Sequence, residues 1–415
     1  MKKLLFNFLF IFCVSNALIC QIQIHSFSAA RSQSATTLNS PVMLGARAKL
    51  LNPVNFGPGG TYPKTVSIDD KLILQGNTTD ISTKDIFFLG NFNIPNTVPP
   101  FSDDEIDSIY SWSLRGGKVI LSAGQIYPEY GIFSDLFNSK WDFVMGLYGN
   151  STGTLVTHTN PSAAGEGIFN GPFGNVTSVN QGGITQSFIL SGPQNSQCFA
   201  TIAGGGAWAA YLDCKTLDLI VADVDYFTSL GGISSDETIV NMQDKFWANT
   251  IAFMDTLQQP PVLIHTHDTL SVDKGYLSYQ WYRNNQKIEG ANAYSYMVTE
   301  PGNYHVETMV NGGCRVQSKD YYKDNCDVFV PTAFSPDGDG VNDVACAYYP
   351  CYEKFDFTIY NRWGEVVFES HDTQTCWNGI YRGEKANTGT YAWSFYVNRS
   401  SGEKIIRKGT ITLIR

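Results

Sequence analysis

Seven residues near the C-terminus have the side chains and spacing of a cation-binding loop. Residues 337–343 read Asp-Gly-Asp-Gly-Val-Asn-Asp, and the oxygen-bearing members are Asp337, Asp339, Asn342 and Asp343. Such oxygens are the ligands that Ca²⁺ prefers, so calcium is the one cofactor that the sequence suggests. The spacing does not fit an EF-hand loop, and an Asx-rich turn that begins a domain is the interpretation that the sequence favours.

Side chains for covalent catalysis are few in residues 45–258. This region holds one histidine, His158, and two cysteines, Cys198 and Cys214. A thiol nucleophile needs a nearby base, and a single histidine gives little support for one. Ser122 lacks the G-x-S-x-G context, and the glycines of 203–207 lack a phosphate-loop or dinucleotide spacing.

A pair of histidines follows this region. His265 and His267 stand two apart on a predicted strand, so they share one face. That spacing is compatible with a metal, but the sequence offers no third ligand, so we assign no site to the pair.

Composition limits the class of protein. The chain has 415 residues, a net charge of −10, 16% charged and 13% aromatic residues. Its length indicates two to four domains, and its aromatic content excludes a wholly disordered chain. The acidic balance and the absence of a basic run exclude a nucleic-acid partner.

The N-terminus predicts export. Lys2 and Lys3 precede a short apolar stretch, and Ser15 and Ala17 supply the small residues of a cleavage site, so 1–17 is predicted to be a secretory signal peptide. A lipid anchor at Cys20 is disfavoured by the bulky Ile19 before it.

An exported protein meets an oxidising compartment, where cysteines usually form disulfides. Proximity in the sequence suggests the pairs Cys198–Cys214 and Cys314–Cys326. It leaves one cysteine over among three later ones, which are Cys346, Cys351 and Cys376. The sequence alone leaves the connectivity open.

The first half of the chain alternates strand and helix patterns. Residues 18–44 are small and polar, which predicts a linker or an irregular first strand. An apolar run at 85–90 precedes a helix pattern at 102–114 with an N-terminal Ser102, and a second apolar run follows at 118–124. This order predicts a βαβ unit in a parallel sheet covered on both faces.

The pattern returns near the end of this region, with a strand at 217–223 and a helix that begins at 235–237 and stops at 258–261. Together these segments resemble the class I glutamine-amidotransferase-like domains, which implies a flavodoxin-like α/β domain over 45–258. The resemblance also implies a Cys-His-Glu triad, but His158 precedes both cysteines and the elbow near 121–125 has no cysteine.

Doubly wound sheets bind ligands beyond the carboxyl ends of their strands. The residues predicted there are Asn91, Gly124, Gln125, Asp223 and Asp225. The two aspartates could bind a cation or sugar hydroxyls, but an aspartate at a strand end also caps turns, and the second role is favoured.

Residues 260–325 alternate at the spacing of a β-sandwich. An inward Trp281 and a tyrosine on a later strand resemble the immunoglobulin-like modules of bacterial surface proteins. The sequence lacks the cysteine that antibody domains carry on their second strand.

The C-terminal 327–415 carries the most specific resemblance. Its segments are VPTAFSPDGDGVND at 330–343, FTIYNRWGEVVF at 357–368, CWNG at 376–379, GTYAW at 389–393 and KGTITLIR at 408–415. This series resembles the gliding-motility-associated C-terminal domain, the type B sorting signal of type IX secretion, and departs from it in Cys346 and Asn378. Residues 355–360 alternate and 361–364 form a turn, which predicts an all-β sandwich with a hairpin.

The resemblance implies export through the periplasm, by the type IX secretion machinery acting on 327–415, to the cell surface or the medium. The sequence thus predicts a multidomain protein, with a flavodoxin-like α/β domain followed by two β-sandwich domains. We expect a non-catalytic binding or adhesion head with a polysaccharide or protein ligand. The alternative is a secreted hydrolase that uses Asp223, Asp225 or Glu129 as acid or base, and the missing triad argues against it.

Overall fold

The computed structural model describes residues 21–27, 36–71, 82, 85–90, 102–122, 140–141, 144–147, 155–157, 162–180, 186–189, 196–202, 208–266, 268–323, 328–349, 354–398 and 404–415. The chain divides into two compact units, Met1–Met297 with Tyr304–Tyr321 and Val298–Asn303 with Tyr322–Arg415. In the parts that the structure describes, every helix is too short or too polar to cross a membrane.

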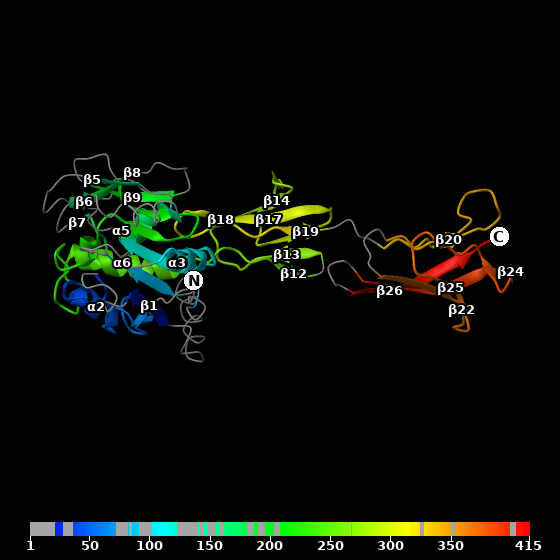
Figure 1. The fold of residues 1–415 in the computed structure, drawn as a ribbon, viewed down its shortest axis with the longest axis horizontal. Helices are drawn as coiled ribbons and strands as arrows, with labels where there is room; N and C mark the ends of the chain where they lie inside the picture. The colour runs from blue at the N-terminus through cyan, green and yellow to red at the C-terminus, as the bar shows by residue number, and fades with distance from the viewer. Residues whose placement is uncertain are drawn as a thin grey trace, which may run out of the picture. The chain divides into compact units, whose positions relative to one another are not determined.

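The first unit begins with a sheet whose first half is parallel (Figure 1). Its strands lie in the order β2 (Thr65–Lys71), β1 (Gln21–Phe27), β3 (Ile86–Leu89), β4 (Lys118–Ser122) and β11 (Leu219–Val221). The predicted βαβ unit is confirmed, because β3 and β4 are parallel neighbours joined through a helix. Of the two interpretations of 18–44, the structure supports a first strand over a linker, since β1 lies between β2 and β3.

Local sequence explains the helix of this unit, α3 (Asp103–Leu114). The Ser102 side chain accepts the amide of Glu105, and the Glu105 carboxylate accepts the amide of Ser102 at 2.9 Å, which is a capping box. Ile109 and Tyr110 are buried, whereas Leu114 is 42% exposed.

The second half of the sheet is antiparallel. Its strands are β10 (Trp208–Asp213), β9 (Ser196–Ile202), β6 (Leu155–Thr157) and β7 (Ser178–Asn180), with β8 (Gln186–Ile189) beside β10 and β5 (Val144–Leu147) beside β8. The parallel flavodoxin-like sheet that the resemblance implied is therefore not what we observe. The glycine-, threonine- and serine-rich residues 146–212 add antiparallel strands, so the sheet is mixed.

The remaining helical segments are η2 (Pro41–Met43), α2 (Leu44–Leu51), α5 (Ala163–Phe169), η4 (Val224–Phe227) and α6 (Met242–Thr256). Alternate strand residues such as Phe88 and Ile120 share one core cluster with Trp247 of α6. Their neighbours Phe87 and Val119 point to the opposite face and are equally buried, so both faces of the parallel half are covered. We call the unit formed by β1–β11 and these helices the head.

The predicted start of α6 at 235–237 was wrong. The helix begins at Met242, because Asn241 caps the amide of Asp244 and the Asp244 carboxylate accepts the amide of Asn241. The predicted end is confirmed, since Thr256 is the last helical residue before Gln258.

The described residues of 260–323 form the predicted β-sandwich. One sheet has β12 (Ile264–Thr266), β13 (Thr269–Ser271) and β16 (Ser295–Met297), and the other has β14 (Ser278–Arg283), β15 (Gln286–Lys287), β17 (Gly302–Met309), β18 (Arg315–Gln317) and β19 (Tyr321–Lys323). Trp281 of β14 is fully buried and stacks on Tyr296 of β16 at 5.9 Å between ring centroids, so it joins the two sheets as predicted.

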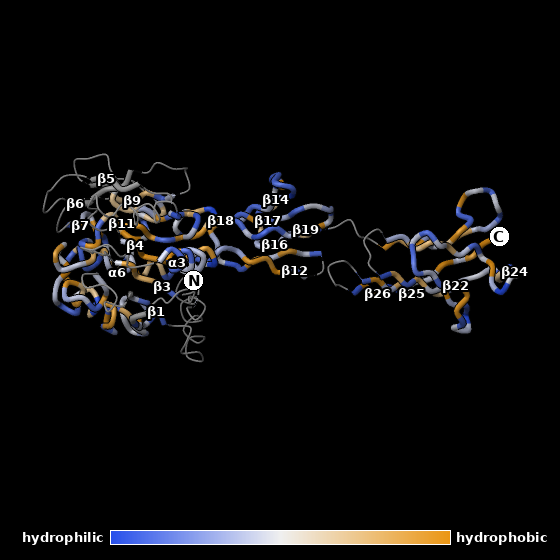
Figure 2. Tube along the Cα trace, in the orientation of Figure 1, coloured by the Kyte–Doolittle hydropathy of each residue, from blue (hydrophilic) through white to orange (hydrophobic). Residues whose placement is uncertain are grey.

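The described part of the second unit is all-β, as predicted. A five-stranded sheet has the order β20 (Ala333–Phe334), β26 (Lys404–Leu413), β25 (Gly389–Asn398), β21 (Lys354–Tyr360) and β22 (Val366–Ser370), and a separate hairpin has β23 (Ile380–Tyr381) and β24 (Glu384–Lys385). Phe355, Phe357 and Ile359 are buried on one face of β21, which confirms the predicted alternation. Figure 2 shows apolar segments, in orange, among the strands of both units.

Candidate functional site

The predicted ligand positions fall into two groups. Asn91, Gly124 and Gln125 lie outside the described residues, as do Glu129 and His158 among the residues considered for catalysis. Asp223 and Asp225 are described, and they follow β11 directly at the carboxyl edge of the parallel strands. This edge is where a doubly wound sheet binds ligands, so the two aspartates are the candidate ligand-binding residues of the head.

Asp223 is the N-cap of η4. Its carboxylate Oδ1 accepts the amide of Asp225 at 2.9 Å, and the residue is 8% exposed. This is the turn-capping role that the sequence favoured for it.

Asp225 lies in the first turn of η4 and is half-buried. Its Oδ1 accepts the hydroxyl of Thr228 at 3.0 Å, and burial raises the pKa of its carboxyl group despite that bond. Tyr226 is fully buried, and its hydroxyl makes no hydrogen bond to any described residue. Burial and the charges of Asp223 and Asp225 raise the pKa of Tyr226. These three polar groups come from one short turn, and Asp225 is the one that is partly exposed to solvent.

The acidic loop 337–343 forms a tight turn at the start of the second unit. One carboxylate oxygen from each of Asp337, Asp339 and Asp343 lies within 4.8 Å of the others. Asp343 accepts the amides of Gly338 at 2.7 Å and Gly340 at 2.8 Å, which lower the pKa of its carboxyl group. Asn342 supplies its backbone carbonyl to the amide of Ser335 at 2.9 Å, in the left-handed region at φ +55°. These bonds are those of an Asx-rich turn, and calcium binding stays a prediction.

Sequence reasoning missed a buried histidine in the head. His25 of β1 lies between two carboxylates, with Nδ1 2.6 Å from Asp69 of β2 and Nε2 3.0 Å from Asp85 before β3. Burial lowers the pKa of His25, but the hydrogen bonds and charges of Asp85 and Asp69 outweigh it, so the pKa lies above 6.5. No local motif signals this cluster, because its members come from three segments of the chain.

The His25 cluster predicts a pH-dependent stability. A folded-state pKa above the unfolded value means that the stabilisation is complete below about pH 6.5 and is lost as the pH rises through the folded pKa of His25. We expect the free energy of unfolding of the wild type to fall over that window relative to that of His25→Gln. Denaturant titrations from pH 5 to pH 9 measure both, and parallel curves would contradict the assignment.

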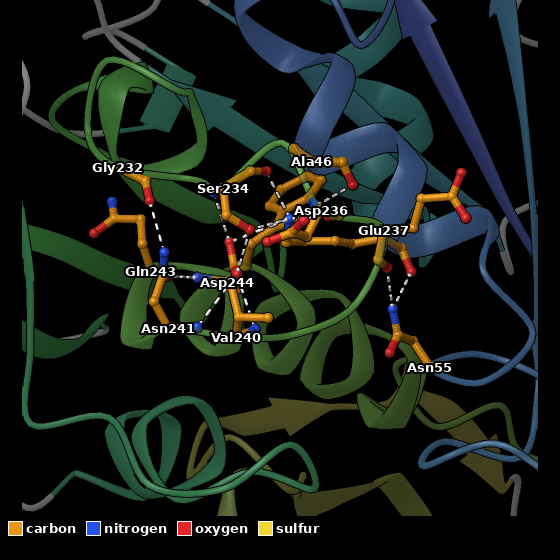
Figure 3. Close-up of polar contacts among 12 residues, drawn as sticks. Ala46, Asn55, Gly232, Ser234, Asp236, Glu237, Val240, Asn241, Gln243 and Asp244 are labelled. Atoms are coloured by element: carbon orange, nitrogen blue, oxygen red, sulfur yellow. Dashed lines mark hydrogen bonds and ion pairs between the residues drawn. The ribbon is translucent and has the colours of Figure 1, made fainter.

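A second cluster fixes the loop before α6 (Figure 3). The Lys49 ammonium of α2 and the Asp244 carboxylate of α6 are fully buried and 3.4 Å apart. Asp244 accepts the amides of Ser234 and Val240, each at 3.0 Å, and the Ser234 hydroxyl at 2.9 Å. Lys49 donates to the carbonyl oxygen of Ser234 at 2.7 Å. The pair is structural, since these bonds hold 234–240 against α2.

The structure corrects the cysteine pairs suggested by proximity. Cys214 bonds with Cys314 across a sequence separation of 100, and Cys346 bonds with Cys376. Neither Cys198–Cys214 nor Cys314–Cys326 forms, because the turn between β17 and β18 brings Cys314 to the end of β10. Connectivity depends on the distance between Cα atoms, 5.0 Å for the first pair, and not on proximity along the chain.

Cys198 of β9 remains a free thiol. Burial raises the pKa of this thiol to about 11, partly offset by a hydrogen bond with Ser196. A nucleophilic cysteine requires the opposite shift, so Cys198 in this state is a poor nucleophile.

The comparison with protein families concerns the second unit. Residues 328–413 match the CHU_C type IX secretion signal domain. The match covers five strands of the sheet and the β23–β24 hairpin, and it agrees with the resemblance noted in the sequence. It shows a chain exported to the cell surface or the medium. Below, the sorting domain means residues 328–413.

Other comparisons add little. No curated protein matches the chain. Among solved structures, fibronectin(III)-like modules of Clostridium thermocellum CbhA show 13% identity over 35% of this chain and 83% of theirs, with a TM-score of 0.16. A Bacteroides ovatus glucan utilization protein, SGBP-B, shows 13% identity over 37% of this chain and 45% of its own, with a TM-score of 0.13. Latent PorU of Porphyromonas gingivalis shows 11% identity over 64% of this chain and 30% of its own, with a TM-score of 0.17.

Proposed function

We propose that the protein is a surface-displayed binding protein whose head takes an extracellular polysaccharide or protein ligand. The sorting domain delivers it, after passage of the inner membrane by the predicted signal peptide. The observation that carries the proposal is the joint between the head and the β-sandwich. A display protein must hold its binding head firmly on the module that carries it.

The joint combines a disulfide with a shared core. The Cys214–Cys314 disulfide links the end of β10 to the β17–β18 turn, and Val310 and Val316 beside that turn belong to the core cluster of the head. Gly312 permits this approach, since a Cβ atom there would lie 2.4 Å from the Leu212 side chain. Disulfides of this kind stabilise folded proteins by about 2 to 4 kcal/mol.

Hydrogen bonds complete the joint. Asn311 donates its amide to the Gln258 side chain at 2.9 Å and its side-chain amide to the Thr256 carbonyl at 3.1 Å. Tyr276 of the sandwich donates its hydroxyl to the Gln259 carbonyl at 2.7 Å. The C-terminus of α6 is thereby fixed to the sandwich. Such a joint would resist the force that a bound extracellular ligand exerts on the head.

The ligand would bind at the carboxyl edge of the parallel strands, beside Asp223 and Asp225. The amidotransferase-like ancestry of the head remains part of the proposal, supported by the β3–α3–β4 unit at that edge. A secreted hydrolase is the second candidate, because the raised pKa of the half-buried Asp225 is what a general acid needs.

A screen of the purified full chain separates the two candidates. We expect retention on an extracellular polysaccharide or protein, no turnover of glycoside, ester or amide substrates, and retention weakened by Asp225→Asn. Asp236→Asn is the matched control, since that residue contributes its backbone carbonyl to Lys49. Turnover by the wild type that disappears in Asp225→Asn would overturn the binding proposal in favour of the hydrolase.

A further inference from the structure

The most exposed large apolar side chain in the described parts of the chain is a tryptophan of the sorting domain. Trp363 is 82% exposed and lies in the turn between β21 and β22. An exposed tryptophan leaves its aromatic ring in water, and tryptophan is enriched at protein–protein interfaces relative to the rest of the surface. Such a side chain can serve as a binding residue if the turn around it has a fixed backbone conformation.

The backbone of the turn is firmly held. The side-chain oxygen of Asn361 accepts the amides of Trp363 at 2.9 Å and Glu365 at 3.0 Å, and its backbone carbonyl accepts the amide of Gly364 at 3.0 Å. Gly364 has φ +79°, a conformation that other residues rarely adopt. The tryptophan is therefore presented outward by a preorganised turn, which lowers the entropy cost of binding.

A second turn is fixed beside it. The Glu365 carboxylate accepts the hydroxyl of Tyr381 at 2.7 Å and the guanidinium of Arg382 at 2.8 Å, and these contacts lower the pKa of Glu365. They tie the β23–β24 hairpin to the β21–β22 turn. Each turn thereby contributes an arginine and an aromatic ring to one surface.

The two pairs have the same form. The Arg362 guanidinium lies 5.6 Å from the Trp363 ring centroid, and that of Arg382 lies 5.0 Å from the Tyr381 ring centroid. We call Arg362, Trp363, Tyr381 and Arg382 the arginine–aromatic surface. Tryptophan, tyrosine and arginine are the residues that contribute most to binding at protein interfaces. Glu365 forms an ion pair with Arg382 at 2.8 Å, so the net positive charge of this surface comes from Arg362.

We propose that the arginine–aromatic surface is the face by which the type IX secretion machinery binds this domain. The partner is an acidic protein surface with an apolar recess for the Trp363 ring, since charge complementarity and burial of that ring favour such a partner. The surface lies within the residues that match the secretion signal domain, and the machinery must bind such a signal on its exposed side. The proposal rests on export through the sorting domain.

The test uses the full chain in cells that have a type IX secretion system. Trp363→Ala should reduce the ratio of exported to retained chain by about tenfold or more, as truncation of a central interface tryptophan does. Arg362→Glu, a charge reversal on the same turn, should also reduce it. Ile406→Ala is the matched control, because Ile406 is 58% exposed on β26 and outside the surface, and it should leave the ratio unchanged.

Thermal unfolding of the purified variants accompanies the export assay. Loss of export with an unchanged melting temperature supports the proposal, and normal export of both Trp363→Ala and Arg362→Glu overturns it. If Trp363→Ala lowers the melting temperature, Arg362→Glu decides. A chain lacking 328–415 separates the role of the arginine–aromatic surface from the sorting role of the whole domain. If that chain is retained while the variants are exported normally, only the role of the surface is rejected. If that chain is exported, the sorting role itself is rejected. A change confined to self-association also overturns the proposal.

Discussion

Removal of residues 328–415 is expected to abolish surface display and to leave the chain in the periplasm. The match to the type IX secretion signal domain lies in these residues. The first unit should still fold without them, because the head cluster and the Cys214–Cys314 disulfide use only residues before 322. Cell fractionation and accessibility of the chain to added protease measure the outcome.

The control for this deletion must keep the sorting domain folded. Ile406→Ala serves again, since it changes an exposed side chain and leaves the buried face of the sheet intact. The melting temperature of the truncated chain should match that of the first unit within the full chain. Undiminished display of the truncated chain would refute the sorting role.

Replacement of Asp244 by alanine is expected to lower the free energy of unfolding by about 3 to 5 kcal/mol, the usual cost of removing one partner of a buried ion pair. It leaves the fully buried Lys49 ammonium without its carboxylate. It also removes the acceptor of the Ser234 and Val240 amides and one half of the α6 capping box. Burial already lowers the pKa of Lys49, and Asp244 opposes that shift, so the lysine should lose its proton more easily in the variant.

Two comparisons isolate the ion pair. Glu237→Gln changes an exposed carboxylate of the same loop and leaves intact its backbone carbonyl, which accepts from Asn55, so its unfolding free energy should stay within about 0.5 kcal/mol of the wild type. The double variant Lys49→Met with Asp244→Leu should recover part of the loss, because no charge is then left buried. Chemical denaturation measures all three, and a loss below about 1 kcal/mol in Asp244→Ala would show that water or another group replaces the carboxylate.

Local patterns predicted their elements well. Ser102 predicted the start of α3, because an N-cap side chain bonds a backbone amide only three residues away. Alternation along 355–359 gave the buried face of β21, and the Asn361–Gly364 turn gave the hairpin. The start of α6 was misplaced because Ser235, Asp236 and Glu237 have the composition of a helix start, whereas Lys49 from another helix bonds the backbone there.

Some candidate site residues could be predicted from local sequence, and others are brought together only by the fold. The sequence identified Asp223 and Asp225 at a strand end, and the structure shows them in one turn with the buried Tyr226. It gave no sign of His25, because Asp69 and Asp85 reach it only after three strands align. It also gave the wrong disulfides, since the true partner of Cys214 lies 100 residues away.

The sequence by itself determined the order of the modules, the sorting domain and its hairpin turn, because these depend on neighbouring residues and on a motif series read along the chain. Only the tertiary structure decided the mixed sheet, the place of β1 within it, the joint made by Cys214 and Cys314, and the buried clusters of His25 and Lys49. Each of these needs groups that are distant in the chain to meet. Their energies depend on burial and on separations of a few ångströms, and spacing in the sequence does not encode such distances.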